Sequence, residues 1–273
     1  MAPIFTKLEP GARRFHFYGW KPDLPDKRDF LYAVPHPVAQ ALPASVDLRP
    51  GCPAVYDQGQ LGSCTANAIA GAIEFELKKQ KLPDFMPSRL FIYYNERVIE
   101  NDVALDNGAQ IRDGIKSVVA QGVCAEQLWP YSDKNTDPSP CPTCAYAEKP
   151  PANCYTQAKT HTVKLYQRLN QVLGTLKGCL AAGYPFVFGF TVYESFESQA
   201  VASTGIVPMP APSEKIVGGH AVVAVGYDDA KQEFIVRNSW GTSWGIKGYF
   251  MMPYAYVTDS NLADDLWTIQ SVT

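Results

Sequence analysis

The sequence predicts an α+β protein whose first half is rich in helices and whose second half is rich in strands. The segment that starts at Cys64 is apolar on nearly every face, as expected for a helix buried in a core. Strand-like runs dominate the chain from Phe186 onward. The sequence places a thiol at Cys64, an imidazole at His220 and an amide at Asn238, each in a context that suits one reactive site. Such a site would bring the two halves together.

The composition is that of a globular chain. Its 273 residues are 46% hydrophobic and 19% charged, enough to bury a sizeable core without disulfides. The net charge of −3 with no basic run argues against nucleic acid as the main partner. No apolar stretch approaches the length needed to span a membrane. We expect a monomer that needs no cofactor or metal.

The N-terminus does not have the continuous apolar core of a secretory signal. The compartment is therefore open, and the protein is either cytoplasmic or exported by another route. Residues 1–41 are rich in proline and aromatic residues, which predicts an extended arm instead of a helix. The stretch Tyr32–Ala41 resembles a linker. We expect a helix-rich half over 42–150 and a β-rich half over 151–273.

Three helices are predicted in the first half. The first opens at Cys64 with Ser63 as its N-cap, and its dipole would favour a thiolate there. The second starts after Pro87 with Ser88 as its cap, and the third spans 109–121 and stops at Gly122. An irregular excursion over 133–151 follows. The second half is predicted to hold a helix over 172–182 and strands over 186–192, 220–227, 234–237 and 249–252.

The seven cysteines leave six if Cys64 is reactive: Cys52, Cys124, Cys141, Cys144, Cys154 and Cys179. They could form disulfides in an oxidising compartment or stay free in the cytosol. Cys141-Pro142-Thr143-Cys144 has the spacing of a metal or redox motif, but there is no second pair at that spacing. A disulfide or plain thiols are therefore favoured over a zinc site.

Each candidate residue also has a purely structural interpretation. A cysteine in an alanine-rich helix is usually a buried thiol, a histidine in an apolar strand is often a core residue, and Asn238 beside Trp240 could belong to a packed loop. Their occurrence together, in the order Cys, His and Asn, favours a cysteine nucleophile activated by an oriented imidazole.

These motifs resemble those of the papain family of cysteine peptidases, in particular its small bacterial members. The resemblance covers about residues 42–265 and rests on four blocks. The blocks are Leu42-Pro43-Ala44-Ser45-Val46-Asp47, Gln58-Gly59 with Gly62-Ser63-Cys64, Gly219-His220-Ala221, and Asn238-Ser239-Trp240-Gly241 with Trp244-Gly245. The resemblance implies a papain-like two-lobed fold, with a helical half, an antiparallel β-barrel-like half and an active-site cleft between them.

The resemblance also implies the roles of the site residues. Cys64 would be the nucleophile, His220 the base and then the acid, Asn238 the orienting amide, and Gln58 an oxyanion donor. Substrate contacts are implied at Gly108, Ala109, Gln110, Ile111, Gly219, Ala221 and Trp240. The chain departs from the family signature at Leu61 and Thr65, where a cysteine and an aromatic residue are usual. From Gly219 we expect a roomy, mostly apolar pocket.

Three functions fit this pattern. The first is a cysteine endopeptidase that cleaves peptides or proteins through a thioester, and the second is an exopeptidase or amidase on the same fold. The third is a catalytically silent binding protein, which is disfavoured because both Cys64 and His220 are present. The aromatic cluster Phe15–Asp23 predicts that the arm lies in or beside the cleft as an intramolecular inhibitor. Alternatively, these aromatics patch the neighbouring core.

Overall fold

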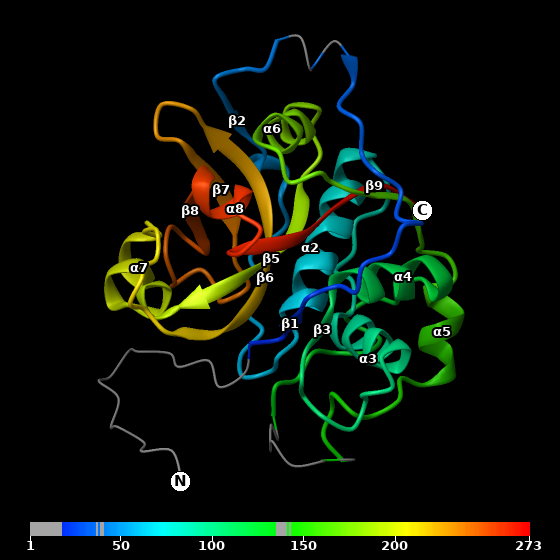
Figure 1. Ribbon diagram of the computed structural model, residues 1–273. Helices are drawn as coiled ribbons and strands as arrows, with labels where there is room; N and C mark the ends of the chain where they lie inside the picture. Colours follow the sequence, from blue (N-terminus) through cyan, green and yellow to red (C-terminus); the bar gives the residue numbers. More distant parts are fainter. Residues whose placement is uncertain (1–17, 37, 39–40, 135–140, 142) are drawn as a thin grey trace, which may run out of the picture.

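The computed structural model describes residues 18–36, 38, 41–134, 141 and 143–273. Phe15, His16 and Phe17 of the aromatic cluster lie outside the described residues. In Figure 1 the helices α3, α4 and α5 gather on one side of the long helix α2, and the antiparallel strands lie on its other side.

The first two predicted helices begin where the sequence places them. The central helix is α2 (Cys64–Lys79), and every residue from Cys64 to Leu77 is buried. Around it lie α3 (Arg89–Ile99), α4 (Ile111–Gln121) and α5 (Ala152–Ala158). The hydroxyl of Ser88 accepts a hydrogen bond from the backbone N–H of Phe91, as predicted for a helix cap. α4 starts two residues later than predicted because Ala109 and Gln110 form the short strand β3 (Ala109–Gln110).

The strands form one antiparallel seven-stranded sheet. Its order is β4 (Val163–Arg168), β9 (Ala263–Val272), β5 (Phe186–Tyr193), β6 (Ile216–Asp228), β7 (Glu233–Arg237) and β8 (Tyr249–Pro253), and β2 (Ser45–Asp47) also pairs with β6. Shorter elements complete the fold: η1 (Arg49–Gly51), α6 (Leu173–Ala181), η2 (Glu194–Glu197), α7 (Gln199–Thr204) and α8 (Tyr254–Thr258).

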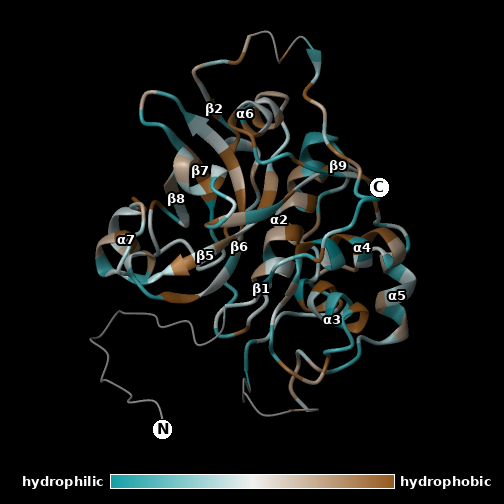
Figure 2. Cartoon of the chain, viewed as in Figure 1, coloured by the Kyte–Doolittle hydropathy of each residue, from teal (hydrophilic) through white to brown (hydrophobic). Residues whose placement is uncertain are grey.

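The hydrophobic residues lie along α2 and the strands beside it (Figure 2). One buried cluster joins α2 to the inner face of the sheet, and a second lies on the other face of the sheet, among α6, α8 and η2. Within the described chain, no helix is both long and apolar enough to cross a bilayer. The burial of α2 on all sides explains why its sequence shows little amphipathic pattern.

The arm crosses the front of the molecule between α2 and the sheet. Its strand β1 (Trp20–Lys21) pairs in parallel with β3, with Trp20 opposite Ala109. Farther along, Leu31 bridges to Arg168, and the backbone N–H of Tyr32 donates to the carbonyl of Arg168 at 2.8 Å. Tyr32 is buried, so the stretch predicted as a linker begins with an anchored residue.

Cys141 and Cys144 form a disulfide, whereas Cys52, Cys64, Cys124, Cys154 and Cys179 are free thiols. Among the described residues, no group of His, Cys, Asp or Glu side chains is arranged to hold a metal ion. Ser63 is at the N-cap position of α2, but the prediction that its side chain caps the helix is wrong. Its hydroxyl lies 2.5 Å from the Tyr131 hydroxyl instead.

Candidate active site

Cys64 is the first residue of α2, so its side chain lies at the positive end of a helix dipole. It is fully buried, and the backbone amides of Ala221, Gly19 and Thr65 lie close enough to favour its thiolate. Ala221 follows His220 on β6. The thiol therefore lies beside the strand that carries the imidazole, although 155 residues separate the two in sequence (220 − 64 − 1).

The imidazole of His220 is held on two sides. Its Nε2 atom lies 2.9 Å from Oδ1 of Asn238, and the ring stacks on the indole of Trp240 with centroids 4.8 Å apart. The backbone N–H of Ser239 donates to the same Oδ1 atom at 2.8 Å. Because this atom accepts from Ser239, it is an acceptor for His220 too, and Nε2 carries the proton. Nδ1 is left as the basic nitrogen.

Gln58 lies at the junction of the two halves. Its side-chain carbonyl accepts from the Ser239 hydroxyl at 2.5 Å, and its amide donates to the Leu61 carbonyl at 2.9 Å. An amide NH₂ has two donors, so one of them is left for another acceptor. Gln58 is buried, so both its position and its orientation are restricted.

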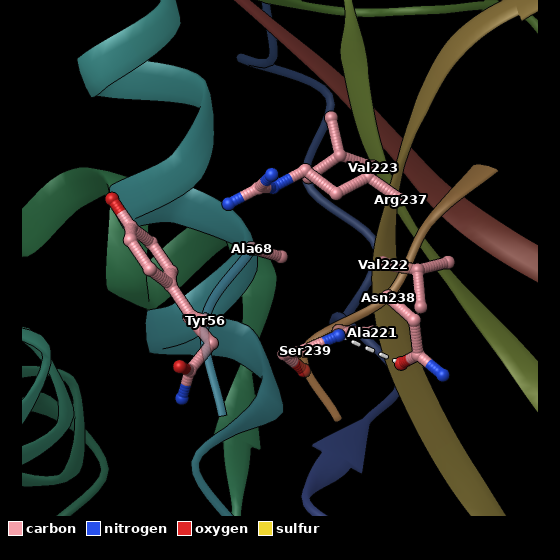
Figure 3. Close-up of a pocket in the computed structure, with 9 residues that line it drawn as sticks. Tyr56, Ala68, Ala221, Val222, Val223, Arg237, Asn238 and Ser239 are labelled. Carbon is pink, nitrogen blue, oxygen red and sulfur yellow. Dashed lines mark hydrogen bonds between the residues drawn. The ribbon is translucent and has the colours of Figure 1, made fainter. Parts of the chain in front are cut away.

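Backbone hydrogen bonds join the Gln58 segment to the Asn238 segment. The N–H of Gln58 donates to the Ser239 carbonyl, and the N–H of Gly241 donates to the Tyr56 carbonyl, both at 2.9 Å. Figure 3 shows Asn238 and Ser239 next to each other on the sheet side, with Arg237 extending toward α2 and Tyr56. The guanidinium of Arg237 donates to the carbonyls of Pro53 and Ala54. These contacts fix the predicted amide and oxyanion residues relative to each other.

Cys64 and His220 are both buried, and their charged forms are disfavoured. Burial raises the pKa of the Cys64 thiol to about 12, and the nearby backbone amides only partly oppose this. Burial lowers the pKa of His220 to about 4, and the hydrogen bond that His220 donates to Asn238 only partly opposes this. Burial therefore favours the neutral thiol and the neutral imidazole.

The arm covers the site. Tyr18 packs against His220 and Trp240, with ring centroids 6.1 and 6.5 Å away. The carbonyl of Gly19 accepts from the N–H of Ala109 at 2.7 Å. A side chain at Gly19 would overlap the carbonyl of Gly62, two residues before Cys64. The arm backbone therefore runs directly over Cys64.

The predicted substrate-contact residues surround this segment of the arm. Gly108 has φ +74° and touches Gly19, Ala109 pairs with Trp20, and Gln110 pairs with Lys21. Gly219 touches the Trp20 ring, Ala221 adjoins Cys64, and Trp240 covers His220. Ile111 is different: it is fully buried in the core cluster at the start of α4.

Sequence reasoning missed Asp265, which is fully buried next to the Trp20 ring. The indole N–H of Trp20 donates to Oδ2 of Asp265 at 3.1 Å. A carboxylate therefore lines the position that the indole occupies, which the expectation of a mostly apolar pocket did not include. A pattern search could not assign Asp265 to the site, since it lies 45 residues beyond His220 (265 − 220) in a strand that was not predicted.

Comparisons with known proteins agree with this geometry. The family model described as papain family cysteine protease matches residues 42–267. An uncharacterised peptidase C1-like protein of Acanthamoeba polyphaga mimivirus is 44% identical over 281 residues, which cover 94% of this chain and 87% of the relative. Cathepsin K of Gallus gallus is 29% identical over 216 residues, which cover 77% of this chain and 58% of the relative.

A solved structure is similar over nearly the whole chain. Xylellain, a cysteine protease from Xylella fastidiosa, has a TM-score of 0.90 and 47% identity, over 98% of this chain and 100% of its own. The bromelain protease from Ananas comosus, at 20% identity and a TM-score of 0.56, shares the fold. The predicted α+β papain-like fold is therefore confirmed. With a family match over 226 of its 273 residues (267 − 42 + 1), the chain belongs to the papain family of cysteine proteases.

Proposed function

We propose that this chain is an endopeptidase in which Cys64, His220, Asn238 and Gln58 form the catalytic machinery. The main observation behind the proposal is that Nε2 of His220 lies 2.9 Å from Oδ1 of Asn238, while the His220 ring stacks on Trp240. With Nε2 bonded to the amide, Nδ1 is the nitrogen that takes the proton from the Cys64 thiol. A lone buried cysteine would need no such oriented imidazole beside it.

The reaction then proceeds in two stages. The Cys64 sulfur attacks the peptide carbonyl, and the His220 imidazolium gives its proton to the departing amine, which leaves a thioester on Cys64. Water, deprotonated by His220, attacks the thioester, the C–S bond breaks, and the thiol recovers the proton. The remaining amide donor of Gln58 and the backbone N–H of Cys64 would stabilise the oxyanion in both stages.

The path of the arm supports internal cleavage over an exopeptidase or amidase. The described arm residues continue on both sides of Cys64, toward Glu197 on one side and toward Glu100 on the other. A cleft that accommodates chain on both sides of the nucleophile suits an endopeptidase. Blocked peptides should therefore be cleaved at least as fast as their free-ended counterparts. A strict requirement for a free terminus would favour the exopeptidase alternative.

Labelling of the thiol tests the catalytic proposal. We expect a thiol-reactive peptidyl epoxide to add one equivalent at Cys64 and to abolish hydrolysis. Cys64→Ala should be neither labelled nor active, and His220→Ala should be labelled far more slowly. Cys52→Ala, which removes a free thiol elsewhere, is the matched control and should behave as the parent protein. Normal hydrolysis by Cys64→Ala would refute the assignment.

We also propose that the arm restrains the enzyme. Residues 18–21 lie on the site, and an anchor of buried polar contacts holds the next segment. Asp23 accepts from the Trp267 indole at 2.8 Å, and Asp29 pairs with Arg112 at 2.5 Å. A tethered segment has a high effective concentration, so modest contacts in the cleft could exclude substrate. Deleting residues 1–41 should raise hydrolysis of small peptides, whereas equal or lower activity of a folded truncated chain would favour the core-patch alternative.

The division into two halves belongs to the same proposal. A helix-rich half over 42–150 would carry the nucleophile, and a β-rich half over 151–273 would carry His220 and Asn238, with the cleft between them. Peptides and proteins would be the substrates, and a monomer would suffice. Sedimentation of the purified chain tests the last point.

A further inference from the structure

Two of the free thiols lie in contact with each other, outside the candidate active site. Cys124 follows α4 and Cys154 belongs to α5, and both side chains are fully buried. The Cys124 thiol lies within hydrogen-bond distance of the Cys154 thiol. The contact is a tertiary one, because 29 residues separate the two cysteines in sequence (154 − 124 − 1). A disulfide would need only a further approach of the two sulfur atoms, to about 2.05 Å.

Hydrogen bonds already hold the two cysteine segments next to each other. The backbone N–H of Ala125 donates to Oε1 of Gln157 on α5 at 2.8 Å. Gln157 is three residues after Cys154, so the two side chains lie on the same face of that helix. The carbonyl of Cys124 accepts from the N–H of Ser88, the cap of α3, at 2.8 Å. A bond between the two sulfur atoms would therefore need little movement of the backbone.

The chain between the two cysteines reaches the turn that precedes the nucleophile helix. The hydroxyl of Tyr131 donates to the carbonyl of Gln58 at 2.8 Å and lies 2.5 Å from the hydroxyl of Ser63. Two residues farther on, Oδ2 of Asp133 accepts from the backbone N–H of Gln60 at 3.2 Å. Both contacts are made with the turn before α2. A disulfide between the two cysteines would close a loop that contains both of them.

The chemistry needs an oxidant and an opening of α5. Burial raises the pKa of the Cys124 thiol, so few thiolates form while the helix is in place. α5 has only seven residues, and short elements open locally. A low-molecular-weight disulfide would be the oxidant. One cysteine thiolate attacks it and releases one small thiol. The other cysteine thiolate then attacks the mixed disulfide, which releases the second small thiol as the bond between Cys124 and Cys154 forms.

We propose that Cys124 and Cys154 form a reversible disulfide that, once made, holds the Tyr131 segment against the turn before Cys64. Closing a loop of 29 residues removes conformations from the unfolded and locally opened chain. The oxidised protein therefore resists opening beside the nucleophile, and reduction reverses this. Oxidising conditions would in this way prolong the life of the folded site without any change in the site itself.

The test uses the full chain with Cys64→Ala, so that the active-site thiol does not compete for the oxidant. The protein is incubated with oxidised glutathione, its remaining thiols are blocked with iodoacetamide under denaturing conditions, and the digest is mapped by mass spectrometry. We expect a pair of peptides joined through Cys124 and Cys154, which dithiothreitol separates. Cys124→Ser should abolish the joined pair. Cys52→Ala, which removes a free thiol elsewhere, is the matched control and should form the pair as before.

The consequence for stability is measured on the same samples by Tm and by hydrogen exchange of residues 58–63 and 125–134. Oxidation should raise Tm by about 5–15 °C, as a closed loop of this length does in a chain of this size. It should slow exchange in both segments by about tenfold or more. Cys124→Ser should show neither change, and Cys154→Ala gives the same comparison if Cys124→Ser does not fold.

Three results would overturn the proposal. The first is that both thiols are still alkylated after prolonged oxidation of the parent chain. The second is a bond from Cys124 or Cys154 to a different cysteine. The third is a bond between the two that leaves exchange around Tyr131 unchanged. None of these results bears on the peptidase function, because the nucleophile is absent from the protein that is tested.

Discussion

Gly19→Ala in the full-length chain is the sharpest perturbation of the arm, because it changes one atom at the point of closest approach. The new Cβ would overlap the carbonyl oxygen of Gly62, a backbone atom that cannot rotate away. The ordinary separation of such atoms is about 3.5 Å, so the arm must move outward by more than about 1 Å. A displacement of that size breaks hydrogen bonds.

The magnitude follows from the contacts that would be lost. The neighbouring bonds are the one from Ala109 to Gly19, at 2.7 Å, and the one from Trp20 to the Asp265 carboxylate, at 3.1 Å. A neutral bond contributes about 0.5–1.5 kcal/mol and one to a charged group about 1.5–3 kcal/mol, so their joint loss costs about 2–4.5 kcal/mol. At about 1.4 kcal/mol per tenfold, the ratio of open to closed arm should rise about 30- to 1,600-fold.

The assay is hydrolysis of a small fluorogenic peptide by full-length protein, normalised to the fraction labelled by the epoxide. Gly19→Ala should be activated up to the ceiling set by the fully open enzyme. Gly174→Ala is the matched control, because a Cβ there meets nothing within 4 Å and should leave the rate unchanged. A normally folded Gly19→Ala protein with parental activity would mean that the arm does not limit access to the site.

Further predictions concern the catalytic residues and the pH dependence of the arm. Gln58→Ala should lower kcat by about 10²–10³ with little change in KM, as for loss of one oxyanion donor, and an unchanged kcat would exclude that role. Asn238→Ala should cost less activity than His220→Ala, because the base remains when only its orientation is lost, and the reverse ranking would contradict these roles. Burial, with the nearby Asp265 charge, raises the pKa of Asp23 to about 7 from its ordinary 3.8. Between pH 3.8 and about 7, Asp23 is protonated when the arm is docked and ionised when the arm is released. Docking of the arm therefore weakens as the pH rises through this window, and its strength is constant above the window. The activity of the parent relative to Gly19→Ala should rise over that window, and Asp23→Asn should flatten the rise.

The sequence was sufficient for the elements with strong local signals. The apolar run after Cys64, the cap at Ser88 and the stop at Gly122 placed the first three helices to within a few residues. It did not reveal β9, since two adjacent aspartates at its start break the alternation that marks a strand. β4 was missed as well, and α5 is a short helix within a proline-rich region.

The candidate site divides in the same way. Cys64, His220 and Asn238 could be proposed from the sequence because each lies in a distinctive local motif, and the structure brings His220 and Asn238 within hydrogen-bond distance. Asp265 has no such motif, because its position depends on a bulge and on pairing with β5. Ser63 shows the converse error, since its local pattern predicts a cap but a tertiary contact with Tyr131 takes its hydroxyl. Local patterns indicate which residues are reactive, whereas the subsites depend on contacts between distant segments.

The same arm residues would restrain the enzyme in two ways at once. It lies over the thiol, and it adds to the burial that raises the pKa of Cys64 to about 12 and lowers that of His220 to about 4. Departure of the arm would rehydrate the pair, and solvation favours the thiolate and imidazolium forms that attack needs. Access of the substrate and activation of the nucleophile would then both follow from the release of residues 18–21.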